Sequence, residues 1–115
     1  MTQESNPMMV LVAGPYRSGT NDDPAKMAAN VDAMNRAALE VFRAGHLPVT
    51  GEALALPLID ISGEFDAIFH PIARRLVDRC DAVLRIGGPS TGADEMVERA
   101  QTRGARIFHS VAELP

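Results

Sequence analysis

The chain has 115 residues, of which 11 are Lys or Arg and 15 are Asp or Glu, so its formal net charge is −4. This length predicts one domain over residues 1–115, with residues 1–7 as a flexible N-terminus. The acidic balance argues against a nucleic-acid partner, which usually requires a basic protein face. Cys80 is the only cysteine, which excludes an internal disulfide and a Cys-rich zinc site.

We expect a cytoplasmic protein without a membrane partner, for two reasons. No apolar run approaches the roughly 20 residues that span a bilayer. The polar start, residues 1–7, lacks the basic and then apolar pattern of a signal peptide.

The first half of the chain predicts a strand, a helix and a second strand. Residues 8–13 are continuously apolar, which is typical of a strand buried on both faces. After a polar loop, Asp23 and Pro24 predict the start of a helix over residues 24–44. Residues 46–50 read as a short strand, and its proline favours an edge position.

The second half is less regular at its beginning. Residues 51–69 are too apolar for a solvated linker, and we expect a packed loop or short helices, buried either on the domain's own core or against a partner subunit. Four further elements are then expected: a helix from Pro71 to Arg79, a strand over 81–86, a helix over 93–103 and a strand over 105–109.

Alternating strands and helices predict an α/β fold, a three-layer sandwich with a flavodoxin-like parallel sheet of four or five strands. Strand 46–50 is expected at an edge beside strand 8–13, with strand 81–86 on the other side. Ligands of such sheets bind beyond the carboxyl ends of the strands, where the winding direction reverses. The topology therefore predicts a small-molecule crevice between the loops 14–23 and 87–92.

Two features of these loops suit an anion. The loop 14–23 lacks both the lysine of a P-loop and the G-x-G-x-x-G pattern of dinucleotide-binding loops. It contains Arg17, however, whose guanidinium fork matches phosphate or carboxylate. The alternative for Arg17 is a solvated surface position. Residues 90–92 stand at a predicted helix N-terminus, where free N–H groups attract anions. Simple capping by Ser90 or Thr91 is the alternative there.

Short motifs along the chain also carry a family resemblance. They are Val10-Leu11-Val12-Ala13-Gly14-Pro15-Tyr16, Asn30, Ala44-Gly45-His46-Leu47-Pro48-Val49, Cys80-Asp81-Ala82-Val83 and Pro89-Ser90-Thr91-Gly92-Ala93 with Ala100 and Gly104. With these motifs the chain resembles the nucleoside 2-deoxyribosyltransferase-like superfamily, in particular small members that open with "AGPY" or "AGPM". The resemblance implies a flavodoxin-like sheet and a nucleoside or nucleotide ligand.

Enzymes of that superfamily cleave or transfer at the N-glycosidic bond of a deoxynucleoside or nucleoside 5′-monophosphate. A glutamate attacks the anomeric carbon, an aspartate assists, and neighbouring subunits often complete the site. The resemblance therefore implies no metal, no cofactor and a homodimer or larger homo-oligomer, which the apolar stretch 54–61 also favours. The ligand- and phosphate-binding residues it implies are Gly14, Tyr16, Arg17, Ser18, Asn30, Ser90, Thr91 and Gly92.

The chain departs from the family at both acidic positions. The position of the family glutamate is Met96 and that of the aspartate is Ala73, and neither side chain can do the work of a carboxylate. Asp94, in the first turn of the predicted helix, is the best remaining candidate for the catalytic carboxylate. Glu95 is the second candidate, although a surface pair with Arg99 is the simpler expectation.

Other acids come from the irregular segment and could also enter the site; they are Glu52, Asp60, Glu64 and Asp66. Two hypotheses follow. One is an N-glycosidase or deoxyribosyltransferase that uses a displaced carboxylate. The other is a catalytically inactive module that binds a nucleotide or sugar phosphate. Residues 87–94 also resemble the glycine-rich loop of lysine-decarboxylase-like phosphoribohydrolases, which again implies a nucleoside monophosphate.

Overall fold

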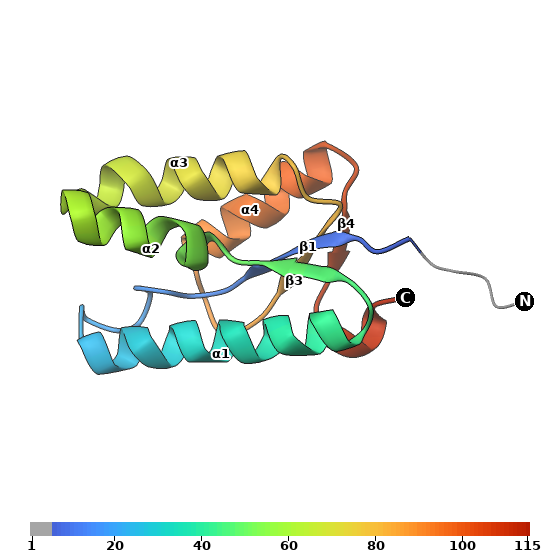
Figure 1. The fold of residues 1–115 in the computed structure, drawn as a ribbon, viewed down its shortest axis with the longest axis horizontal. Coiled ribbons are helices and arrows are strands. Elements are labelled where there is room, and N and C mark those ends of the chain that lie inside the picture. The colour runs from blue at the N-terminus through green and yellow to red at the C-terminus, as the bar shows by residue number, and fades with distance from the viewer. Residues whose placement is uncertain (1–5) are drawn as a thin grey trace, which may run out of the picture.

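The structure is a computed structural model that describes residues 6–115 (Figure 1). Residues 1–5 of the segment predicted to be flexible, 1–7, lie outside the described residues. The described chain forms an α/β three-layer sandwich in which helices cover both faces of one parallel sheet. This confirms the predicted fold class.

The sheet has four parallel strands in the order β2-β1-β3-β4. Their bounds are β1 Met9–Ala13, β2 Leu47–Val49, β3 Ala82–Arg85 and β4 Arg106–Phe108. The predicted neighbours of β1 are confirmed: Val10 pairs with Pro48 on one side and with Ala82 on the other. Pro48 lies in the edge strand, where the N–H that it lacks is not needed by a second neighbour.

Alternate residues of β1 face two separate apolar clusters. Val10 and Val12 pack with residues of α1, which spans Pro24–Arg43 and runs below the sheet in Figure 1. Leu11 and Ala13 pack on the opposite face with residues of α3 (Phe65–Val77) and α4 (Thr91–Thr102). Because helices cover both faces, β1 has no polar side, as its continuous apolar sequence predicts.

Three hydrogen-bonding side chains fix where helices begin. Asp23 accepts from the backbone N–H of Ala25 at the start of α1, as predicted. Thr50 caps α2, which spans Gly51–Ser62. Ser90 caps α4, so this helix begins at Thr91, two residues before the predicted start.

Of the two alternatives expected for the segment 51–69, the structure shows helices and not a packed loop: the segment contains α2 and the beginning of α3. Pro71 does not begin a helix, as the sequence suggested, but lies inside α3, and Pro57 lies inside α2. A helical proline leaves the carbonyl four residues earlier without its usual donor. Ala53 and Ala67 carry these carbonyls, and both residues are exposed.

A short 3₁₀ turn, Val111–Glu113, follows β4 and was not expected from the sequence. Val111 packs beside the cluster on the α1 face. Within the described residues, no helix combines the length and the apolar character needed to cross a membrane.

Candidate functional site

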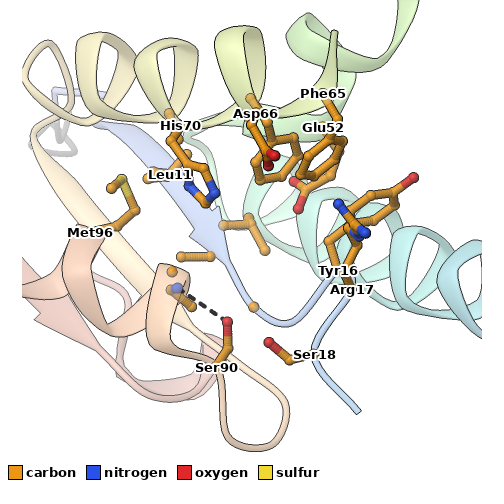
Figure 2. Close-up of a pocket in the computed structure, with 18 residues that line it drawn as sticks. Leu11, Tyr16, Arg17, Ser18, Glu52, Phe65, Asp66, His70, Ser90 and Met96 are labelled. Atoms are coloured by element: carbon orange, nitrogen blue, oxygen red, sulfur yellow. Dashed lines mark hydrogen bonds between the residues drawn. The ribbon is translucent and has the colours of Figure 1, made fainter. Parts of the chain in front are cut away.

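A cavity of about 260 Å³ opens beyond the carboxyl end of β1 (Figure 2). This volume is just below the range of small-molecule sites, roughly 300–1,000 Å³. The loop after β1, the first turns of α2 and α4, and one side of α3 form its walls. The lining residues are Leu11, Val12, Ala13, Gly14, Tyr16, Arg17, Ser18, Gly51, Glu52, Phe65, Asp66, Phe69, His70, Ala73, Ser90, Gly92, Ala93 and Met96.

Two glycines allow the loops after β1 and β3 to approach each other. A Cβ at Gly14 would lie 3.0 Å from the carbonyl oxygen of Ile86. A Cβ at Gly87, whose φ is +79°, would lie 2.7 Å from the ring of Pro15. At Gly87 a side chain would both contact the Pro15 ring and be strained by the positive φ, so glycine is favoured there. The predicted convergence of the two loops is confirmed, since Arg17 and Ser90 line one cavity.

One end of the cavity presents groups that suit an anion. Figure 2 shows Ser18 and Ser90 on the same side of the cavity, reached from the two loops. Ser90 is buried, and its hydroxyl accepts from the backbone N–H of Ala93 at 3.2 Å. Gly92 also lines the cavity, so this end coincides with the N-terminus of α4. Helix N-termini attract negative charge through free N–H groups and the helix dipole.

Arg17 is held in place by two neighbours. Its Nε and Nη2 donate to one carboxylate oxygen of Asp22 at 3.0 and 2.9 Å. Its guanidinium also lies 4.6 Å from the ring centre of Phe65, within the range of a cation–π interaction. Arg17 therefore already pairs with a carboxylate in the absence of a ligand.

Asn30 and Thr91, both expected to bind ligand, do not line the cavity. The side-chain amide of Asn30, on α1, donates to the carbonyl of Tyr16 at 2.8 Å and so stabilises the loop after β1 from outside the cavity. Thr91 is exposed at the start of α4. The cavity is lined by the other implied binding residues: Gly14, Tyr16, Arg17, Ser18, Ser90 and Gly92.

The other end of the cavity is aromatic. Phe65 and Phe69 stack with ring centres 4.7 Å apart, and Tyr16 lies 5.9 and 5.5 Å from them at interplanar angles below 20°. His70 meets Phe69 edge-on at 5.6 Å. Phe65 and Phe69 were not among the predicted site residues, because residues 65–69 were not predicted to form part of a helix. Their spacing, one helical turn apart, was the available signal.

Glu52 is the buried acid of the site. It is 7% exposed, lies in the first turn of α2 and lines the cavity. Within residues 6–115 no Lys or Arg forms a salt bridge with it. Burial raises the pKa of its carboxyl from an ordinary 4.5 to about 7, partly offset by a hydrogen bond from its own backbone N–H.

Asp94 and Glu95, the expected catalytic carboxylates, do not line the cavity. Asp94 is exposed and accepts from Nε of Arg85 at 3.0 Å. Arg85 also donates to the carbonyls of Ile86 and Gly88, so this pair braces the loop that leads to Ser90.

Glu95 pairs with Arg74 of α3 at 2.8 Å instead of with Arg99, the expected partner. Arg99 reaches Asp78 at 2.6 Å, so both pairs join α3 to α4. The hydrogen bond from Arg74 lowers the pKa of Glu95, which keeps that carboxylate ionised and occupied.

Met96 and Ala73 both line the cavity. The two positions where the resemblance implies carboxylates therefore face the site but carry apolar side chains. The titratable groups of the cavity come from three elements: Asp66 and His70 from α3, Glu52 from α2, and Arg17 and Tyr16 from the loop after β1.

No group of three or more His, Cys, Asp or Glu side chains in the described part of the chain is placed to hold a metal ion. A scan of the sequence against protein-family models found no match, and a search of curated proteins found no matching relative.

Proposed function

We propose that the cavity binds a (deoxy)nucleoside 5′-monophosphate and that the protein cleaves its N-glycosidic bond. One observation carries the proposal: a single cavity has an anion-binding end, at Ser18, Ser90 and the N-terminus of α4, and an aromatic end, at Phe65, over which Arg17 lies. A nucleotide has the same two ends, a phosphate and a flat base, joined by the sugar whose bond to the base is cleaved.

The phosphate is expected at the N-terminus of α4. There it meets the hydroxyls of Ser18 and Ser90. Arg17, which lies over Phe65 in this structure, reaches the phosphate from the loop after β1 by a change of side-chain rotamer. A guanidinium donates two parallel hydrogen bonds to phosphate oxygens. Arg17 makes a comparable contact with Asp22, so binding exchanges one anionic partner for another.

The base is expected at the aromatic end. The rings of Tyr16 and Phe65 offer apolar surface and π-faces or edges, on which any nucleobase can pack. Asp66 lines the same end and can accept hydrogen bonds from N–H groups of a base.

A second candidate function is nucleotide or sugar-phosphate binding without catalysis. The specific observation in its favour is that Met96 and Ala73 line the cavity where the resemblance implies a glutamate and an aspartate. This candidate uses the same phosphate end and differs only in its chemistry.

The test is a panel of ribo- and deoxynucleoside 5′-monophosphates with the matching nucleosides. Thermal shift measures binding, and chromatography measures free base. The proposal predicts stabilisation by monophosphates and release of base from at least one. Stabilisation without release of base favours the second candidate. The absence of both stabilisation and release contradicts both candidate functions.

We also propose that the protein acts in the cytoplasm as a homodimer or larger homo-oligomer. A nucleotide ligand and a buried, unpaired Cys80 suit a reducing compartment that holds nucleotides. Exposed leucine and isoleucine side chains on α2 support self-association.

A further inference from the structure

The first turn of α2 contributes a buried carboxyl group to the cavity. Of all Asp and Glu residues that the structure describes, Glu52 alone is buried, and it is buried in the wall of the cavity. Gly51 lines the same wall, and so does Arg17, whose guanidinium lies over the ring of Phe65. Figure 2 shows Glu52 beside Phe65 and Tyr16, on the side opposite Ser18 and Ser90.

We propose that Glu52 is the general acid of this site, donating its proton to the nucleobase as the bond between base and sugar breaks. This inference rests on the proposed function, since it presumes a nucleotide with its phosphate at Ser90 and its base at Phe65. It makes Glu52 a catalytic residue that neither the family positions, Met96 and Ala73, nor the acids of α4 would identify.

The position of Glu52 is fixed by the start of α2. Thr50 is buried, and its hydroxyl accepts from the N–H of Ala53 at 3.1 Å, which sets the first turn. Gly51 packs against α3, where an added Cβ would lie 3.6 Å from that of Ala73. The first turn of α2 therefore packs closely on α3 at Ala73, directly beside Glu52.

The surroundings favour an acid over a nucleophile. Charged and titratable groups that share the cavity are Asp66 and His70 from α3 and Arg17 and Tyr16 from the loop after β1; α4 contributes none. None of them forms a salt bridge with Glu52. A buried carboxyl without a cationic partner retains its proton to higher pH, and a pKa near the working pH suits proton donation.

The reaction balances with water as the only co-reactant. The carbon–nitrogen bond to the base breaks, and its electron pair stays with the base. The proton from Glu52 neutralises the base at a ring nitrogen or carbonyl oxygen. Water adds to the anomeric carbon and loses a proton to solvent, and solvent reprotonates Glu52. The products are free base and a sugar 5-phosphate.

The test compares Glu52→Gln with Glu98→Gln, which makes the same chemical change at an exposed position outside the cavity. Gln mimics the neutral acid but cannot donate a proton as an acid does. For the monophosphate of the panel that wild type cleaves fastest, Glu52→Gln should bind within threefold of wild type. Its kcat should fall at least ~100-fold, the usual contribution of a general acid. Glu98→Gln should retain wild-type kcat.

The pH profile separates an acid from a nucleophile. With Glu52 as the acid, wild-type kcat falls about tenfold per pH unit above about 7, and the descent disappears in Glu52→Gln. A kcat that rises through that range overturns the inference, as does a Glu52→Gln kcat within threefold of wild type. Both outcomes leave the proposed function standing. If wild type neither binds nor cleaves any monophosphate, the proposed function fails, and this inference fails with it.

Discussion

Arg17 is the side chain on which recognition of a phosphate depends most. It is the only Lys or Arg among the cavity-lining residues, and its present partner, Asp22, is exposed. Exposed ion pairs are worth at most about 1 kcal/mol. A ligand phosphate held also by the N-terminus of α4 can therefore replace the Asp22 carboxylate, and Arg17 then also gives up its contact with Phe65.

Replacing Arg17 by Gln should weaken monophosphate binding by roughly tenfold or more, because a charge-assisted hydrogen bond contributes about 1.5–3 kcal/mol. Binding of the matching nucleoside, which has no phosphate, should change little. Isothermal titration calorimetry measures both. Arg43→Gln, on the far end of α1, is the matched control. Equal losses for nucleotide and nucleoside would show that Arg17 does not read the phosphate.

Glu52 should make stability depend on pH. Its pKa is raised on folding, so between pH 4.5 and about 7 the folded protein binds more protons than the unfolded chain. The stability linked to this proton is present below pH 4.5 and is lost as pH rises through about 7, a loss of about 3 kcal/mol.

Urea unfolding of wild type and Glu52→Gln at several pH values measures this loss. The free energy of unfolding of Glu52→Gln should exceed that of wild type by a margin that grows with pH. A margin that stays constant from pH 5 to 8 would mean that Glu52 titrates normally.

At the scale of elements, the sequence predicted the four strands and two of the helices from local signals. The apolar run of β1, the Asp23 cap and the edge position of Pro48 each follow from one physical rule. The helical proline rule misled at Pro71, because packing of α3 against α2 and α4 outweighs one lost hydrogen bond. With α3 begun too late, the aromatic end of the site could not be predicted.

The cap of α4 has two roles that mutation can separate. Ser90→Ala removes the side-chain bond to Ala93 and should cost about 1 kcal/mol of unfolding free energy. Because Ser90 also lines the cavity, monophosphate affinity should fall as well.

Asp23→Ala removes the corresponding cap of α1, outside the cavity, and is the control. It should lower stability by a similar amount without changing affinity. Urea unfolding and calorimetry supply the two readouts. If both variants lost affinity equally, the effect would come from stability and not from a contact of Ser90.

At the scale of the whole molecule, the site joins segments that are distant in sequence: the loop after β1, the starts of α2 and α4, and α3. Parallel topology predicted that the loop after β1 meets the start of α4, because these two segments follow the neighbouring strands β1 and β3. Nothing local marks Glu52 as buried, since its burial arises from packing α2 against α3. The same reason explains why Asp94 and Glu95 were expected in the site but pair with Arg85 and Arg74.

The outer surface of α2 predicts self-association. Leu54 and Leu58 are about half exposed and Ile61 is 85% exposed. Sedimentation velocity should therefore show particles of at least twice the 12.3 kDa chain mass. Ile61→Asp with Leu58→Asp should shift the protein towards single chains, whereas Ala29→Asp, at an exposed position of α1, should not. Particles of 12.3 kDa at every concentration would contradict this prediction.

Amide chemical-shift mapping during titration with a nucleoside 5′-monophosphate tests the central claim most directly. The claim is that the loops after β1 and β3 hold one phosphate between them. The largest shifts should occur together at Arg17, Ser18, Ser90 and Gly92, and the nucleoside without phosphate should leave these four amides nearly unmoved. Shifts confined to one loop, or shifts elsewhere on the fold with these four unchanged, would contradict the claim.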